Sequence, residues 1–257
     1  MTTTCPQDKD MDVFFSGPLR EKDTLTIRFH EGAGFCIGLV DITQVRELLD
    51  GNNGLLLDWL SEEEQKHISR YRFPKRASEW LGGRIAAKAA LLRGDFLQGK
   101  CEPGAITILA DEHGRPIIMR PQRAQMVQVS ISHSSRYGVG MASFHDCGVD
   151  IQRIESRIAK LGDHIGTERE VRMATKAVDS LLEGLTLLWA TKEALKKCCL
   201  FDRPGLCKAS IVERISTKEG NCRRIVCRLA DSGLHQEVWG VFVGGYVLAW
   251  CGREKDA

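Results

Sequence analysis

The feature that most constrains the fold of this chain is a weak internal repeat. Four matches fall at one spacing of 109 residues: Val40–Ile42 with Val149–Ile151, Trp80 with Trp189, Lys88 with Lys197, and Tyr137 with Tyr246. Ordered self-similarity of this kind predicts two copies of one folding unit, related by a pseudo-twofold axis. We therefore expect an N-terminal half over residues 1–145 and a C-terminal half over residues 146–257.

Many short β-like runs and few long helical stretches predict an α+β fold, in which each pseudo-symmetric half packs a long helix on a small, mostly antiparallel sheet. Helices are expected at 78–92 and 185–197, which are rich in strong helix formers. Ser61 and Glu64 form a capping-box pattern that predicts another helix start. Strands are expected from Leu25, over 39–42 after a glycine-rich break at Gly32–Gly38, over 106–118 around a turn, in a hairpin over 127–144, and as three C-terminal strands at 211–216, 223–230 and 238–250.

Composition excludes several classes of protein. A hydrophobic content of 43% and a charged content of 27% are typical of a soluble globular chain, and a net charge of +2 is too small for a nucleic-acid binder. The longest apolar run, 238–250, contains three glycines and is too short to cross a bilayer. The N-terminus shows no signal-peptide pattern, and the ten cysteines lack a CxxC pair. We expect a cytoplasmic protein with no membrane or nucleic-acid partner, no zinc site and no disulfides.

Chemistry-bearing residues gather in two segments of the second half. On a helix over 185–197, Trp189, Glu193 and Lys197 are spaced four apart and share one face. Asp150 lies inside an apolar β-like run, where a carboxylate is costly unless it is paired or coordinated. Two carboxylates of this kind are suitable ligands for a hard cation such as Mg2+. The alternative for Glu193 and Lys197 alone is an ordinary surface ion pair on a helix.

The repeat bears on the number of such sites. At the spacing of 109, the position of Glu193 corresponds to Arg84 in the first half. The carboxylate helix therefore occurs once, and its counterpart carries the opposite charge. This predicts one metal site rather than two, located where the halves meet.

These segments together resemble the signature of the Sfp-type 4′-phosphopantetheinyl transferases. The family has a glycine–apolar–aspartate–apolar element, here at 148–151, and some forty residues later a Trp-x-x-Lys-Glu-x-x-x-Lys element, here at 189–197. Two further family elements match the Gly-Arg-Pro at 114–116 and the Ser-His-Ser at 132–134. The resemblance extends from about Ser61 to Val247 and implies the fold of this family.

The resemblance implies Mg2+-dependent transfer of the 4′-phosphopantetheine arm of coenzyme A to a serine of an apo acyl or peptidyl carrier protein, with release of adenosine 3′,5′-bisphosphate. It implies Asp150 and Glu193 as metal ligands. Many family members have a second acid two residues after the aspartate; here that position is Gln152, whose amide oxygen could replace it. Lys197 would contact the phosphates and Glu168 would accept the serine proton. The coenzyme's phosphates would be held by Lys75, Arg76, Arg115, Ser132 and His133, although a plain β-turn also explains Arg115.

Two other kinds of function stay open. One is a different Mg2+-dependent phosphotransferase, which the absence of a GxxxxGK[ST] phosphate loop disfavours. The other is a non-catalytic module of the same fold that binds coenzyme A or a carrier protein. We expect a monomer, because an internal duplication removes the need for a second chain to build the site. The sequence does not identify the carrier protein.

Overall fold

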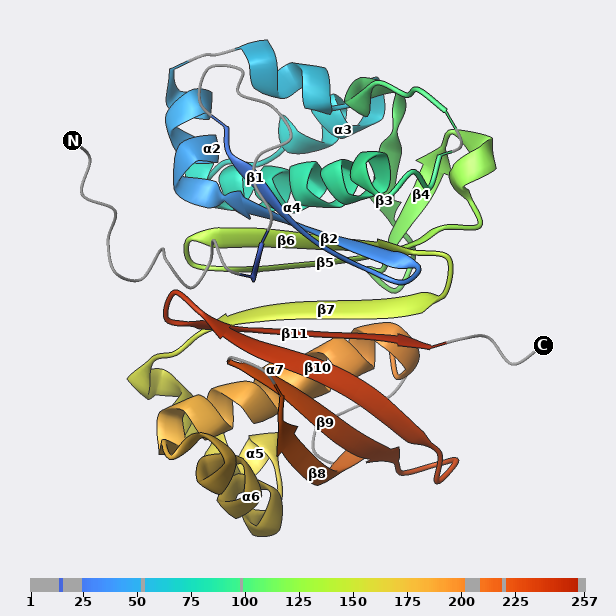
Figure 1. Ribbon diagram of the computed structural model, residues 1–257. Coiled ribbons are helices and arrows are strands. Elements are labelled where there is room, and N and C mark those ends of the chain that lie inside the picture. The colour runs from blue at the N-terminus through green and yellow to red at the C-terminus, as the bar shows by residue number, and fades with distance from the viewer. Residues whose placement is uncertain are drawn as a thin grey trace. The chain divides into compact units, whose positions relative to one another are not determined.

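The computed structural model describes residues 14–15, 25–51, 54–97, 99–201, 209–218 and 221–253 (Figure 1). It divides into two compact units, one formed by Phe15–Asp146 and the other by Cys147–Ala257 together with Met1–Phe14. The division after Asp146 falls one residue from the predicted boundary, whereas Phe14, predicted to lie in the N-terminal half, groups with the second unit. Phe14 contacts Trp250 of the second unit, with 5.5 Å between ring centroids.

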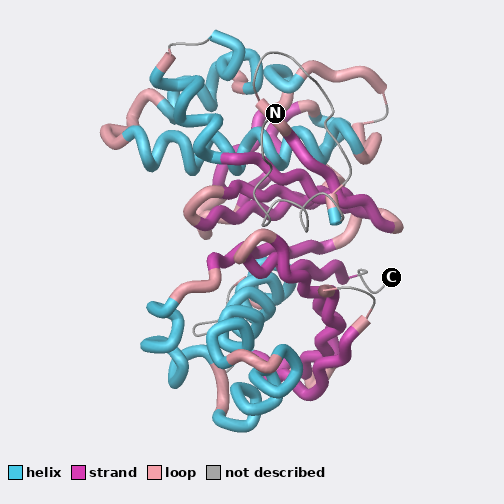
Figure 2. The backbone as a smooth tube through the Cα atoms, turned by 60° about the vertical axis from the view of Figure 1, so that its left-hand side comes forward, coloured by secondary structure: helices cyan, strands magenta, loops and turns pink. Residues whose placement is uncertain are grey.

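The first unit is an antiparallel sheet with helices on one face (Figure 2). Its strand order is β1-β2-β6-β5, and the long helix α4 packs against β2, β5 and β6. The bounds are β1 Ile27–Gly32, β2 Phe35–Asp41, α2 Ile42–Asp50, α3 Glu62–Ile68, α4 Pro74–Arg93, β3 Thr107–Ala110, β4 Pro116–Arg120, β5 Gln128–Ser134 and β6 Tyr137–Ser143. Strands β3 and β4 form a separate two-stranded sheet.

The second unit repeats this plan with a larger sheet. Its strand order is β7-β11-β10-β9-β8, and the long helix α7 packs on β10 and β11 and against α6. The bounds are β7 Asp146–Arg153, α5 Gly162–Ile165, α6 Glu168–Val178, α7 Leu181–Cys199, β8 Ser210–Thr217, β9 Cys222–Leu229, β10 His235–Val243 and β11 Tyr246–Arg253. The order β2-β6-β5 under α4 therefore matches β7-β11-β10 under α7, and the predicted α+β class is confirmed.

The helices of the two units match in a different register from the one the sequence suggested. Lys88 of α4 is fully buried and pairs with Glu64, the capping-box residue of α3. Lys192 of α7 is equally buried and pairs with Glu170, the capping-box residue of α6. Lys88 therefore corresponds to Lys192, 104 residues later, and the predicted match with Lys197 is wrong.

This register also replaces two other predicted matches. With Lys88 placed on Lys192, the position of Glu193 corresponds to Ala89, and Trp80 corresponds to Gly184. The match of Glu193 with Arg84 and the match of Trp80 with Trp189 are therefore wrong. The second unit still carries a carboxylate where the first has none, but the first has a small apolar residue there rather than an opposite charge.

The predicted match of Val40–Ile42 with Val149–Ile151 is also wrong, because these residues do not occupy equivalent positions on their strands. Gly38 faces α4 and Gly148 faces α7, since a Cβ added at either would lie 2.5 Å or 1.9 Å from a helix carbonyl oxygen. Alternate residues of a strand share a face, so Asp150 lies on the helix side of its sheet while Asp41 lies on the other side. Asp41 instead caps α2, its Oδ1 accepting from the Thr43 amide at 2.8 Å.

Replacing Gly148 with Ala should destabilise the second unit by about 1–3 kcal/mol, because the new Cβ would meet helix backbone that cannot move aside. The added atom would lie 1.9 Å from the Ala194 oxygen and 2.8 Å from the Cys198 nitrogen. Gly162→Ala is the matched control, since its Cβ would meet only the Leu185 side chain at 3.9 Å. Urea unfolding would measure both; equal stability of the two variants would contradict the packing account.

The predicted starts and ends of the helices and strands are partly confirmed and partly wrong. The capping box at Ser61 and Glu64 is present, and α4 begins one turn before the predicted start, with Pro74 in its first turn. The predicted break at Gly32–Gly38 is wrong, because β2 already begins at Phe35. The third C-terminal strand is two strands, since Gly244 and Gly245 adopt positive φ angles of 55° and 78° and turn the chain back. Within the described ranges, no helix is long and apolar enough to cross a membrane.

Candidate active site

The centre of the candidate site is Asp150 on β7. Its side chain is only 3% exposed, in the middle of a strand whose residues 147–151 are all buried. Lys197, in the last turn of α7, donates from Nζ to Asp150 Oδ1 at 2.7 Å and to the Val149 carbonyl oxygen at 3.1 Å. This pair ties the strand to the helix at the place where both sequence motifs meet.

Glu193 lies one helical turn before Lys197 and shares this environment. Burial raises the pKa of Glu193, and the negative charge of Asp150 raises it further. The ammonium groups of Lys197 and Lys196 oppose this shift without cancelling it. The structure therefore brings the two carboxylates together in the second unit, in an arrangement where their mutual repulsion favours an added cation.

Gln152 completes this group, which we call the β7–α7 cluster: Asp150, Gln152, Glu193 and Lys197. The Gln152 Nε2 atom donates to Asp150 Oδ2 at 3.3 Å. Two carboxylates and an amide supply the hard oxygen donors that Mg2+ prefers, so the residues present fit that ion. Among the residues that the structure describes, no group of three or more His, Cys, Asp or Glu side chains could hold a metal ion, and the β7–α7 cluster brings two carboxylates together.

The predicted proton acceptor lies in a different setting. Glu168 is the first residue of α6, and its side chain is 85% exposed and paired with Arg172 one turn later. Glu170, two residues on, is fully buried and accepts hydrogen bonds from the Thr167 amide and the Val212 amide. Of the two glutamates, Glu168 is therefore the one that a large substrate could reach.

Three of the predicted coenzyme contacts line one pocket in the first unit. The pocket has a volume of about 470 Å³, and its walls come from α4, β5 and the segment before α4. Its lining residues are Tyr71, Lys75, Arg76, Glu79, Trp80, Arg84, Ile131 and His133. The pocket thus combines basic groups with aromatic rings, a combination suited to an anionic ligand that carries a flat base.

Sequence reasoning missed the aromatic part of this pocket. His67 stacks on Trp80 with 5.0 Å between centroids, and the Arg84 guanidinium lies 4.8 Å from the same indole ring. Trp80 and Arg84 are four residues apart on α4, which is a signal available in the sequence. It was hidden by the assignment of Trp80 and Arg84 as repeat partners of the second half.

Ser132 and Arg115 do not line the pocket that His133 lines. Ser132 precedes His133 on β5, so its side chain lies on the opposite face of the sheet, where it is 8% exposed. Arg115 lies in the turn between β3 and β4, where Asp111 Oδ1 accepts from its backbone amide at 2.8 Å. The first unit therefore gathers Lys75, Arg76 and His133, and it separates Ser132 and Arg115 from them.

Comparison with known proteins connects this geometry to a family. A family model described as "4'-phosphopantetheinyl transferase superfamily" matches residues 146–251, which hold the whole β7–α7 cluster. A holo-[acyl-carrier-protein] synthase of Geobacillus sp. (strain WCH70) is 32% identical over 108 residues, covering 41% of this chain and 90% of that protein. The chain belongs to the 4′-phosphopantetheinyl transferase superfamily. It is an enzyme of this family, as the residues of the family's signature predict.

A second curated relative agrees with this membership. The holo-[acyl-carrier-protein] synthase of Anoxybacillus flavithermus is 32% identical over 108 residues, covering 41% of this chain and 89% of that protein. A solved structure of the holo-ACP synthase of Plasmodium yoelii aligns with 42% of this chain and 91% of that chain, at 19% identity and a TM-score of 0.37. The matched relatives of this 4′-phosphopantetheinyl transferase therefore cover less than half of the chain.

Proposed function

We propose that this enzyme transfers the 4′-phosphopantetheine arm of coenzyme A to a serine of an apo acyl or peptidyl carrier protein, and releases adenosine 3′,5′-bisphosphate. The observation that carries this proposal is the β7–α7 cluster, in which the buried carboxylate of Asp150, the half-buried carboxylate of Glu193 and the Lys197 ammonium converge from a strand and a helix. The names of the matched relatives, holo-[acyl-carrier-protein] synthases, support the choice of an acyl carrier protein.

The cluster is the proposed site for Mg2+. Asp150 and Glu193 would hold the ion, and Gln152 would contribute its amide oxygen after rotation of the amide group that now donates to Asp150. When bound, Mg2+ supplies positive charge that stabilises the developing charge on the departing phosphate. The raised pKa of Glu193 fits this assignment, because burial beside Asp150 destabilises its charge until a cation is present.

The protein's own groups position the reactants. Lys197 has three ammonium donors and uses two on Asp150 and Val149, so its ammonium stays at the cluster edge where a phosphate oxygen can accept. Lys75, Arg76 and His133 line the first-unit pocket and would hold phosphate groups of the coenzyme. The serine oxygen forms a bond to phosphorus, the bond from phosphorus to the nucleotide oxygen breaks, and Glu168 takes the serine proton.

Intact-mass measurement of an apo carrier protein incubated with this enzyme, Mg2+ and coenzyme A tests the proposal. We expect a gain of one phosphopantetheine group, together with stoichiometric adenosine 3′,5′-bisphosphate. A gain that persists in excess EDTA would overturn the metal assignment. No gain with acyl and peptidyl carrier proteins alike would overturn the transfer itself and favour a binding module.

Replacing His133 with Ala should raise the KM for coenzyme A by roughly tenfold and leave kcat nearly unchanged, because a hydrogen bond to a charged group contributes about 1.5–3 kcal/mol to binding. His133 lines the pocket, whereas Ser132 lies on the other face of β5. Ser132→Ala is therefore the matched control and should keep the wild-type KM. Steady-state kinetics against coenzyme A measure both, and a larger effect at Ser132 would show that the pocket is not the phosphate site.

A further inference from the structure

A buried ion pair involves Lys192, the neighbour on α7 of Glu193 in the β7–α7 cluster. Glu170 and Lys192 have side chains 1% and 0% exposed, and Lys192 Nζ lies 2.8 Å from Glu170 Oε1. The same carboxylate accepts from the Thr167 amide at 2.7 Å, from Thr167 Oγ1 at 2.8 Å and from the Val212 amide at 2.8 Å. One glutamate thus joins the start of α6, the middle of α7 and strand β8.

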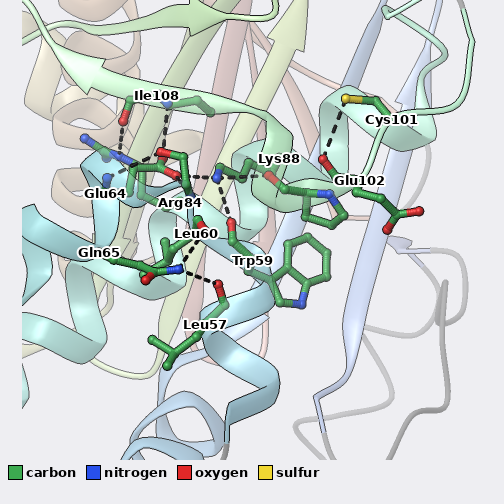
Figure 3. Close-up of polar contacts among 12 residues, drawn as sticks. Leu57, Trp59, Leu60, Glu64, Gln65, Arg84, Lys88, Cys101, Glu102 and Ile108 are labelled. Atoms are coloured by element: carbon green, nitrogen blue, oxygen red, sulfur yellow. Dashed lines mark hydrogen bonds and ion pairs between the residues drawn. The ribbon is translucent and has the colours of Figure 1, made fainter.

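The first unit contains an equivalent arrangement of contacts around Glu64 (Figure 3). Glu64 caps α3 through the Ser61 amide at 2.9 Å, accepts from the Ile108 amide of β3 at 3.1 Å and pairs with Lys88 of α4. Lys88 Nζ also donates to the carbonyl oxygens of Trp59 at 2.6 Å and Pro103 at 3.1 Å. Both units therefore fix their long helix to a short helix and a strand through one buried ion pair.

Apolar packing sets the rotation of α7 only in part. Most of the helix is buried, through residues such as Leu187, Leu188, Ala190, Ala194 and Leu195, and only a narrow stripe with Trp189, Glu193 and Lys196 is half-buried. Apolar contacts are non-directional, whereas an ion pair fixes direction and register. Burying these two charges costs free energy, and the cost is explained if the pair fixes the rotation of α7 about its own axis.

Lys192 and Glu193 are neighbours on α7, about 100° apart around the helix axis. Lys192 is directed to Glu170, and Glu193 to the environment of Asp150. Because a helix turns as a rigid body, the direction of one side chain sets the direction of the other. In the first unit the neighbour of Lys88 is Ala89, so the equivalent arrangement there orients no carboxylate.

We propose that the Glu170–Lys192 ion pair positions Glu193 as a metal ligand by fixing the rotation of α7. Glu170 and Lys192 are positioning residues, since neither touches the reacting atoms. This inference rests on the metal site of the proposed function. Loss of the pair should allow α7 to turn or slide and weaken cation binding, while the first-unit pair contributes to folding alone.

Binding of Mn2+, followed by the EPR signal of the free ion, tests this with Lys192→Met and the matched control Lys88→Met. Lys192→Met keeps the length of the side chain and leaves Glu170 with its donors from Thr167 and Val212. We expect Lys192→Met to weaken Mn2+ binding by roughly tenfold, as for loss of a group that orients a ligand. Lys88→Met should bind Mn2+ within about twofold of wild type, although both variants lower the melting temperature. The Mg2+ concentration for half-maximal transfer should rise for Lys192→Met only.

Asp150→Asn distinguishes the positioning role of the Glu170–Lys192 pair from the existence of the metal site. If it removes Mn2+ binding while Lys192→Met binds as wild type does, the positioning role is overturned and the metal site stands. If Asp150→Asn binds Mn2+ unchanged, the metal site itself is overturned. Should Lys192→Met fail to fold, Glu170→Gln/Lys192→Met removes both charges and keeps a capping amide, and the same expected and opposing results apply.

Discussion

Replacing Glu193 with Gln should reduce transfer to the carrier protein by roughly 10²–10³-fold, the scale expected when a group that stabilises transition-state charge is lost. The change keeps the shape of the side chain and removes the charge that would hold Mg2+ with Asp150. Because burial and Asp150 raise the pKa of Glu193, the folded protein disfavours the ionised form. The variant should therefore be as stable as wild type, or slightly more stable, while it is inactive.

The measurement is the rate of holo-carrier formation by intact mass, set beside the melting temperature. Asp150→Asn should lose activity to a similar extent, and Gln152→Ala should lose less, because Gln152 brings a neutral amide. Glu183→Gln, in the first turn of the same helix, is the isosteric control and should keep full activity. Wild-type activity of Glu193→Gln would refute the assignment of this residue, whatever its stability.

The sequence predicted the β7–α7 cluster well because its chemistry depends on spacing. Glu193 and Lys197 are one turn apart on any helix, and an aspartate inside an apolar strand needs a partner wherever it lies. The structure supplies that partner as Lys197 at 2.7 Å. The capping box at Ser61 and Glu64 was predictable for the same reason, since the pattern specifies contacts within four residues.

The spacing that relates equivalent residues of the two units could not be predicted from the sequence in the same way. Matching identical residues placed Lys88 on Lys197, but a sequence does not show which lysine of a helix is buried. Burial selects Lys192, whose partner Glu170 is distant along the chain. The match between the strands failed because Gly38 and Gly148, which both face a long helix, are 110 residues apart, so a spacing of 109 is one residue out of register and exchanges the two faces of the strand. The assignment of Ser132 and His133 as phosphate contacts stays a prediction, and as neighbours on β5 the two side chains lie on opposite faces of the sheet.

Replacing Glu170 with Ala should lower the free energy of unfolding by about 3–5 kcal/mol, because it leaves the Lys192 ammonium buried without its counter-charge. Besides Glu170, Lys192 Nζ has no hydrogen-bond acceptor among the residues that the structure describes. Glu64→Ala should be milder, since Lys88 keeps the carbonyl oxygens of Trp59 and Pro103. Urea unfolding followed by tryptophan fluorescence measures the order of the two effects.

Glu168→Ala is the control for this prediction, because Glu168 lies in the same first turn but is 85% exposed, so its loss should change stability by less than about 0.5 kcal/mol. The pH dependence gives a second test. Burial would raise the pKa of Glu170, but hydrogen bonds from Lys192, Val212 and Thr167 hold it below its ordinary value of 4.5. A lowered folded-state pKa contributes stability above that value, and the contribution is lost as pH falls through the folded-state pKa. The stability gap between wild type and Glu170→Ala should therefore narrow on acidification below about pH 4.5, and a gap that widens there would show that Glu170 is not the ionised partner of Lys192.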